Sequence, residues 1–176
     1  MKGSAEMAKE PILKTERLIL RPHTIKDAEA CFAWQSDPEV TKFLSRSTSM
    51  DISETREWLK KIKNSDSFMW AMTLKENGAL IGTCAIGESS YMPGYWNFAY
   101  YLRRDQWNKG YATEAAKAMI SFAKEKLGIK KFCAVHAIEN PASGRVIEKC
   151  GLKYHHFGEY SKLDGSATFK AKYYIL

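Results

Sequence analysis

The stretch from Tyr101 to Ala115 has the residue pattern of an anion-binding loop. It reads YLRRDQWNKGYATEA, in which a strand-like segment runs into a short loop and a helix-forming segment follows at once. The first amides of a helix lack hydrogen-bond partners, and the helix dipole adds about half a positive charge there. Gly110 lets the chain turn without a side chain in the way, and Ala112 keeps the approach open. The spacing therefore predicts a loop whose main-chain N–H groups can hold a pyrophosphate.

The loop alone leaves a plain strand–turn–helix connection open as the alternative. Two well-known phosphate-binding patterns are absent from it: G-x-x-x-x-G-K-[ST], which binds nucleoside triphosphates, and G-x-G-x-x-G, which binds dinucleotides. A second motif is needed before the loop indicates a particular ligand.

That second motif spans Asn140–Leu152 and reads NPASGRVIEKCGL, following a predicted strand. Together with WNKGYATEA at 107–115, it resembles the GNAT acetyltransferase superfamily, and within it the RimJ/RimL-like branch of ribosomal-protein N-terminal acetyltransferases. The resemblance covers most of the chain, from TERLILRP at 15–22 through Asp37-Pro38 to Gly151. Two separate motifs at the family's interval make the match specific.

The resemblance implies acetyl-CoA as co-substrate. In the family's loop pattern, [RQ]-x-x-G-x-[GA], Trp107 takes the first place, Gly110 the fourth and Ala112 the sixth. Asn108 departs from the branch, which commonly has glycine at that position. The residues that the resemblance assigns to acetyl-CoA are Tyr101, Leu102, Trp107, Asn108, Lys109, Gly110, Tyr111, Ala112, Thr113, Asn140, Ser143 and Lys149. Lys109, Lys149 and also Arg145 have an equally good alternative as solvated surface residues.

The resemblance also implies how the reaction proceeds. The strands expected at 96–102 and 132–138 would splay apart around the pantetheine arm, with a backbone N–H near Tyr101 or Leu102 placed for the thioester oxygen. Asn140 would hydrogen-bond the pantetheine, cap the next helix, or do both. Ser143 would protonate the leaving thiolate; its alternative is an ordinary polar residue in the first turn of a helix.

The general base is left open by the sequence. Glu159 lies near the position of a RimL-like glutamate, and Glu88 is a weaker choice on a loop; each is also typical of a solvated residue. Cys150 falls on an apolar helix side with Val146 and Ile147, which favours a core thiol over a nucleophile.

The order of expected elements is β-α-α-β-β-β-α-β-α-β-β, which predicts an α+β (mixed α/β) fold. The GNAT resemblance implies a central twisted, mixed, mostly antiparallel sheet flanked by helices. The main expected segments are strands at 17–21, 68–74, 80–86, 95–102, 131–138, 154–160 and 169–175, and helices from Thr24, Asp51, Thr113 and Asn140. We expect residues 1–10 to be a disordered lead and residues 11–176 to form one GNAT N-acetyltransferase domain.

Composition narrows the class of protein further. The 176 residues are 45% hydrophobic and 27% charged with a formal net charge of +7, which suggests an anionic partner. The lysines are scattered, which argues against direct nucleic-acid binding. No apolar run reaches the roughly 20 residues that span a bilayer, and the first ten residues do not resemble a signal peptide, so we expect a cytoplasmic protein without a membrane anchor.

Cysteine and histidine spacing predicts no metal site. The four cysteines are scattered in apolar segments without a C-x-x-C pair, which favours reduced core thiols. His155 and His156 are adjacent, so in a regular strand they would point to opposite faces and could not chelate simply.

We therefore predict an N-acetyltransferase in which a primary amine attacks acetyl-CoA directly within a ternary complex. The acceptor, which the sequence does not identify, could be a protein N-terminus, a small-molecule amine or a polyamine. Alternatives are a longer acyl-CoA donor, a non-catalytic acyl-CoA-binding regulatory module, and a nucleic-acid-binding protein. Both a monomer and a homodimer are compatible with the sequence.

Overall fold

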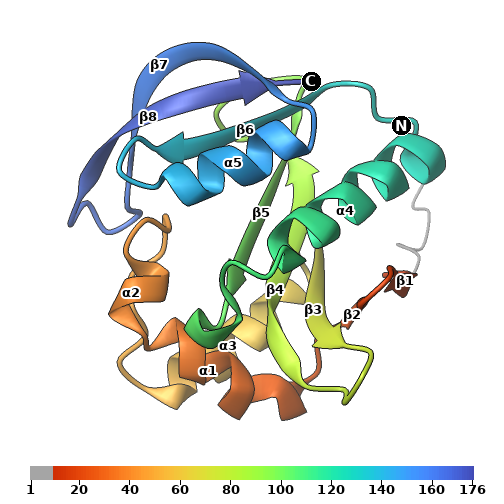
Figure 1. The fold of residues 1–176 in the computed structure, drawn as a ribbon. Helices are drawn as coiled ribbons and strands as arrows, with labels where there is room; N and C mark the ends of the chain where they lie inside the picture. Colours follow the sequence, from red (N-terminus) through yellow and green to blue (C-terminus); the bar gives the residue numbers. More distant parts are fainter. Residues whose placement is uncertain (1–9) are drawn as a thin grey trace, which may run out of the picture.

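The structure, a computed structural model, describes residues 10–176 and contains an eight-stranded sheet with helices on both faces (Figure 1). The strands are β1 (Leu13–Lys14), β2 (Leu18–Pro22), β3 (Phe68–Leu74), β4 (Leu80–Glu88), β5 (Trp96–Leu102), β6 (Phe132–Ala137), β7 (Lys153–Ser161) and β8 (Thr168–Ile175). The α-helices are α1 (Ala28–Gln35), α2 (Pro38–Thr41), α3 (Ile52–Ile62), α4 (Tyr111–Leu127) and α5 (Pro141–Lys149), with 3₁₀ turns η1 (Ile25–Asp27) and η2 (Arg104–Gln106).

The strand order is β1-β2-β3-β4-β5-β6-β8-β7, and each neighbouring pair is antiparallel except β5–β6. The sequence prediction of a mixed, mostly antiparallel sheet flanked by helices is therefore confirmed. The single parallel junction arises because α4 crosses from the end of β5 to the start of β6 (Figure 1).

Two apolar cores form on opposite faces of the sheet. One contains α4 and one side of the strands, with Ala116, Met119 and Phe98 among its buried residues. The other lies under α1 and α3, around Cys31 and Trp34. Because strand side chains alternate between faces, consecutive residues of β5 enter different cores.

The parallel strands separate soon after they meet. Among the described residues, β5 and β6 pair only at Trp96–Phe132 and Asn97–Cys133. Beyond these pairs, residues 98–102 and 134–137 do not form a ladder with each other, which leaves backbone donors and acceptors along both strands for another partner. This is the splay that the GNAT resemblance implies.

Most element boundaries lie within two residues of the sequence prediction, and the differences have local causes. α4 begins at Tyr111 and not at Thr113, because Gly110 already takes the N-cap position with φ +83°. The first helix ends at Gln35, and the predicted stop at Asp37 instead starts α2, whose Glu39 N–H donates to the Asp37 carboxylate. β1 was not predicted.

Two further differences concern the chain start and β7. Residues 1–9 of the predicted lead lie outside the described residues, whereas Glu10 accepts a hydrogen bond from the Met69 N–H at 2.8 Å and so lies against β3. The prediction that His155 and His156 point apart is wrong, because β7 is irregular between Tyr154 and His156. Their Nδ1 atoms lie 2.7 Å apart.

Candidate active site

A cleft of about 840 Å³ lies where β5 and β6 separate. Its walls come from both strands, from the first turns of α4 and α5, from the α2 segment, and from the β7–β8 hairpin. Predicted site residues that line it are Tyr101, Leu102, Trp107, Asn108, Gly110, Tyr111, Ala112, Thr113, Asn140, Ser143, Arg145 and Lys149. Lys109, Glu159, Glu88 and Cys150 lie outside this lining.

The loop before α4 turns through two left-handed residues. Asn108 has φ +60° and Gly110 has φ +83°. Tyr111–Thr113, the first residues of α4, line the cleft, and Gly110 has no side chain to cap their amides. In contrast, side chains cap α2, α3 and α5. The start of α4 therefore presents the cleft with backbone donors suited to an anion.

Arg17 holds this loop against the sheet edge, a role that the sequence analysis missed. One of its guanidinium nitrogens donates to the Lys109 carbonyl at 2.9 Å, and the guanidinium lies 4.6 Å from the Tyr111 ring centroid. Its Nε pairs with the Glu114 carboxylate at 2.8 Å. Burial alone would raise the pKa of Glu114, but hydrogen bonds from Thr15 and Arg17 outweigh it and lower the pKa. These contacts hold the loop backbone against the start of β2.

Trp107 and Lys109 each make a hydrogen bond close to this loop, and only Trp107 lines the cleft. The Trp107 indole donates from Nε1 to the Leu102 carbonyl at 3.0 Å, while the residue is 40% exposed. Lys109 Nζ reaches the Gln106 side-chain oxygen at 3.3 Å. The ammonium of Lys109 therefore makes its hydrogen bond within residues 106–109.

Asn140 and Ser143 meet at the start of α5. The Asn140 side chain accepts a hydrogen bond from the Ser143 N–H at 3.3 Å, so the predicted capping role is observed. The hydroxyl of Tyr100 donates to Ser143 Oγ at 3.2 Å. α5 can approach β6 this closely because residue 144 is glycine: a Cβ there would lie 2.8 Å from His136 Nε2.

The side chains of two adjacent tyrosines of β5 lie on opposite faces of the sheet. Tyr100 packs on the α4 core and reaches Ser143, whereas Tyr101 packs on the α1–α3 core and lies opposite Thr83 in β4. Burial raises the pKa of each phenol to about 12, so both are proton donors at neutral pH. Tyr100 was not among the predicted residues; it lines the cleft and contacts a predicted one.

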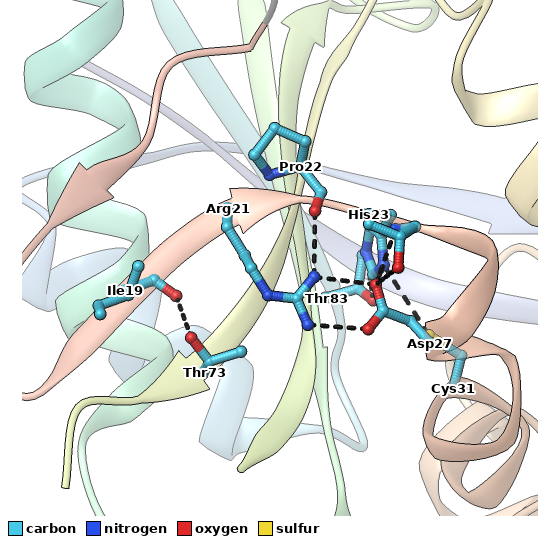
Figure 2. Close-up of polar contacts among 9 residues, drawn as sticks. Ile19, Arg21, Pro22, His23, Asp27, Cys31, Thr73 and Thr83 are labelled. Carbon is cyan, nitrogen blue, oxygen red and sulfur yellow. Dashed lines mark hydrogen bonds and ion pairs between the residues drawn. The ribbon is translucent and has the colours of Figure 1, made fainter. Parts of the chain in front are cut away.

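Figure 2 shows a buried polar cluster around His23 and Asp27. It includes Thr83, the cross-strand partner of Tyr101. His23 Nε2 is 3.2 Å from Thr83 Oγ1, and His23 Nδ1 is 3.8 Å from Asp27 Oδ2 and 3.9 Å from Cys31 Sγ. Arg21 makes two hydrogen bonds to the Asp27 carboxylate, at 2.8 and 2.9 Å. Burial lowers the pKa of His23 to about 4, although Asp27 opposes the shift. The imidazole is therefore neutral at pH 7, and the cluster ties β2, α1 and β4 together beneath the cleft.

The far end of the cleft lies between the α2 segment and the β7–β8 hairpin, which lie side by side in Figure 1. The Tyr160 hydroxyl donates to the Phe43 carbonyl at 2.7 Å, and Lys162 Nζ donates to the Thr41 carbonyl at 2.8 Å. The Leu163 N–H donates to the Ser45 carbonyl at 2.7 Å. These bonds bring together segments that are more than a hundred residues apart.

The structure does not bring Glu159 to the other site residues. Tyr160 lines the cleft, so its neighbour Glu159 points to the opposite face of β7, where it is exposed opposite Lys170. Two carboxylates that the sequence analysis did not consider, Glu39 and Glu139, do line the cleft, and both are exposed. Their positions follow from tertiary contacts and carried no sequence signal.

The cysteines are free thiols, as predicted. Cys150 packs against the α4 core, and burial raises its pKa to about 11, which disfavours a nucleophilic thiolate.

Within residues 10–176 no group of three or more His, Cys, Asp or Glu is placed to hold a metal ion. None of the helices in the described part of the chain has both the length and the apolarity needed to cross a bilayer.

Comparisons with known proteins agree with this geometry. Residues 17–153 match the family model described as the acetyltransferase (GNAT) domain. The chain is 29% identical over 158 residues to N-acetyltransferase p20 of Bacillus licheniformis, covering 87% of this chain and 89% of the relative. It is 30% identical over 147 residues to N-acetyltransferase YoaA of Bacillus subtilis, covering 81% of this chain and 83% of the relative.

The fold also matches a solved structure, an acetyltransferase of the GNAT family from Bacillus anthracis. The TM-score is 0.83 at 24% identity, covering 94% of this chain and 98% of that one. The prediction of an acetyl-CoA-dependent N-acetyltransferase is confirmed at the level of the family. The chain belongs to the GNAT acetyltransferase family.

Proposed function

We propose that this protein transfers the acetyl group of acetyl-CoA to a primary amine by direct attack within a ternary complex. One observation carries the proposal: a single cleft runs from the uncapped start of α4, past the separated ends of β5 and β6, to a second wall made by α2 and the β7–β8 hairpin. A donor and an acceptor can therefore meet inside it.

The residues present fit acetyl-CoA. The amides of residues 108–113 would hold the diphosphate, because Gly110 provides room and the helix dipole favours negative charge. Lys149 and Arg145 line the same cleft and would add positive charge. Separated β5 and β6 would hydrogen-bond the pantetheine arm with their free backbone groups, and Asn140 lies beside that path. The bound thioester supplies an activated acetyl group.

Three groups of this chain would act on the reacting atoms. A backbone N–H near Tyr101 or Leu102 would donate to the carbonyl oxygen as negative charge develops on it. Ser143 would donate a proton to the sulfur as it leaves and would regain one from solvent in the cleft, which it lines. The amine must lose a proton, and the exposed carboxylates that line the cleft, Glu39 and Glu139, would accept it through solvent.

The finer assignment is part of the proposal. Trp107 at the first place of the cofactor loop favours the RimJ/RimL-like branch, and with it a protein N-terminus or a small-molecule amine as acceptor. We place the enzyme in the cytoplasm, as a monomer or homodimer.

The test measures cofactor binding and thiol release separately. Calorimetry should detect CoA binding by the wild type, and thiol release from acetyl-CoA should depend on an added amine from a panel of amines and peptides. Gly110→Glu should weaken CoA binding at least tenfold, because it places bulk and negative charge among the phosphate-binding amides.

Gly78→Glu is the matched control, since Gly78 also has a positive φ (+70°) but has open space around it. Unchanged CoA affinity in Gly110→Glu would contradict the proposed cofactor site. CoA binding without thiol release for any amine would indicate a non-catalytic acyl-CoA-binding module instead.

A further inference from the structure

Tyr100 occupies a special position in the cleft. It is the residue of β5 whose side chain crosses to α5, where its hydroxyl donates to Ser143 Oγ at 3.2 Å. The phenol lines the cleft and packs on the α4 core. Since burial raises its pKa to about 12, the hydroxyl keeps its proton throughout the neutral range and has it available for the bond to Ser143 Oγ.

This contact determines where the Ser143 proton points. A serine hydroxyl has one proton and two lone pairs. One lone pair of Ser143 Oγ is occupied by the Tyr100 proton. Within residues 10–176, no protein group accepts a hydrogen bond from Ser143 Oγ. The Ser143 proton is thus free to be donated to a group in the cleft, which Ser143 lines.

We propose that Tyr100 is a positioning residue for Ser143: it orients the serine hydroxyl toward the CoA sulfur and stabilises the charge on Oγ as the serine donates. The proposal rests on the proposed function, because it requires CoA in this cleft. Hydrogen bonds in such a chain polarise one another, so the Tyr100 bond strengthens the donation from Ser143. Tyr100 acts through Ser143 and does not itself contact the sulfur.

The geometry around the pair supports a positioning role. Asn140 fixes the backbone of Ser143 through its N–H, and Gly144 brings α5 down onto β6. Tyr100 then supplies the remaining constraint, on the side-chain hydroxyl. Backbone and side chain of Ser143 are therefore held by different residues.

The experiment compares the affinities of CoA and desulfo-CoA by calorimetry from pH 7 to pH 10. A serine that donates to the sulfur should make the wild type prefer CoA increasingly as the thiol ionises, because hydrogen bonds to charged acceptors are stronger. Ser143→Ala should reduce this preference about tenfold. Tyr100→Phe, which removes one oxygen, should reduce the preference for CoA severalfold. In the double variant the preference should be no lower than in Ser143→Ala.

Two controls separate positioning from packing. Tyr95→Phe makes the same chemical change on a half-buried tyrosine beside β5 that does not line the cleft, and should leave the preference within twofold of the wild type. Ser143→Thr keeps the hydroxyl and should retain most of the preference. In turnover assays, Tyr100→Phe should lower kcat while the KM for acetyl-CoA stays within twofold.

Each outcome decides the matter. The inference would be overturned if Tyr100→Phe kept the wild-type preference for CoA over desulfo-CoA. It would also be overturned if Tyr100→Phe lowered that preference as much in the Ser143→Ala background as it does in the wild type. Either result would leave the proposed function intact. Equal affinities of the wild type for CoA and desulfo-CoA at every pH would also overturn the inference and leave the proposed function intact. A wild type that binds neither CoA nor desulfo-CoA would overturn both the inference and the proposed function.

Discussion

At the scale of single residues, the loop before α4, which we propose binds the cofactor, depends on two backbone conformations that most side chains avoid. Gly110 adopts φ +83° without cost because it has no Cβ. Asn108 is the one non-glycine residue among those described with a positive φ, at +60°. Asparagine tolerates the left-handed region better than other residues with side chains. The departure from the RimL-like glycine is therefore a substitution that keeps the turn.

Asn108 can be tested by substitutions in both directions. Asn108→Gly should leave the Kd for CoA within about threefold, because glycine adopts the same φ. Asn108→Val should weaken CoA binding about tenfold, since a β-branched residue in this conformation costs about 1–2 kcal/mol and the loop would rearrange. Calorimetry measures both, and Asn64→Val, at an exposed position without a positive φ, is the control. Equal binding by Asn108→Val and wild type would contradict this account.

At the scale of elements, the helices that flank the cleft are anchored by polar contacts from neighbouring strands. Arg17, just before β2, reaches both the loop and the first turn of α4. At the other end of β2, the cluster around His23 joins the start of α1 to β4 (Figure 2). These contacts hold the sheet and its helices in register at the point where the cleft opens.

The buried His23 predicts a pH dependence of stability. Its folded pKa, about 4, lies below the usual value of 6.5, so the unfolded state binds the proton first as the pH falls. The contribution of neutral His23 to the free energy of unfolding is present in full above pH 6.5. It is lost as the pH falls from 6.5 to about 4, by roughly 3 kcal/mol in total. Chemical denaturation across this range should show the loss. His23→Gln should flatten the curve, whereas His156→Gln, on exposed β7, should keep it.

At the scale of the whole molecule, the end of the cleft that we propose for the acceptor exists only because distant segments meet. The α2 segment and the β7–β8 hairpin are joined through Tyr160, Lys162 and Leu163, each of which donates to a backbone carbonyl of residues 41–45. The hairpin has no part in the cofactor loop. The two ends of the cleft should therefore respond separately to substitution.

Lys162 provides the test of this separation. Lys162→Met removes the bonds to the Thr41 and Arg46 carbonyls and should raise the KM for the amine about tenfold, because charge-assisted hydrogen bonds that hold the α2 segment against the hairpin are lost. The Kd for CoA should stay within twofold. Lys170→Met, on the same hairpin and exposed, is the control. A parallel loss of CoA affinity in Lys162→Met would show that the hairpin supports the whole site.

Local sequence pattern was enough to predict the elements around the loop before α4. Gly110, the capped start of α5 and the apolar stripe of α4 act within a few residues of chain, so composition and spacing predicted the elements and the loop between them. The family resemblance then supplied the ligand. β1 escaped prediction because its two residues carry too little periodicity to be recognised.

The proposed acceptor end of the cleft and the contacts of Ser143 were decided by tertiary structure alone. Tyr100 meets Ser143 across 43 residues, and Glu39 reaches the cleft through the packing of α2. The position of Glu159 depended on strand phase: a shift of one residue moves a side chain to the other face of a sheet, and β7 is irregular between Tyr154 and His156. The sequence alone determined which segments form helices, turns and loops, because these structures depend on residues close together in the chain. The tertiary structure decided which side chains share the cleft, because that requires distant segments to pack together.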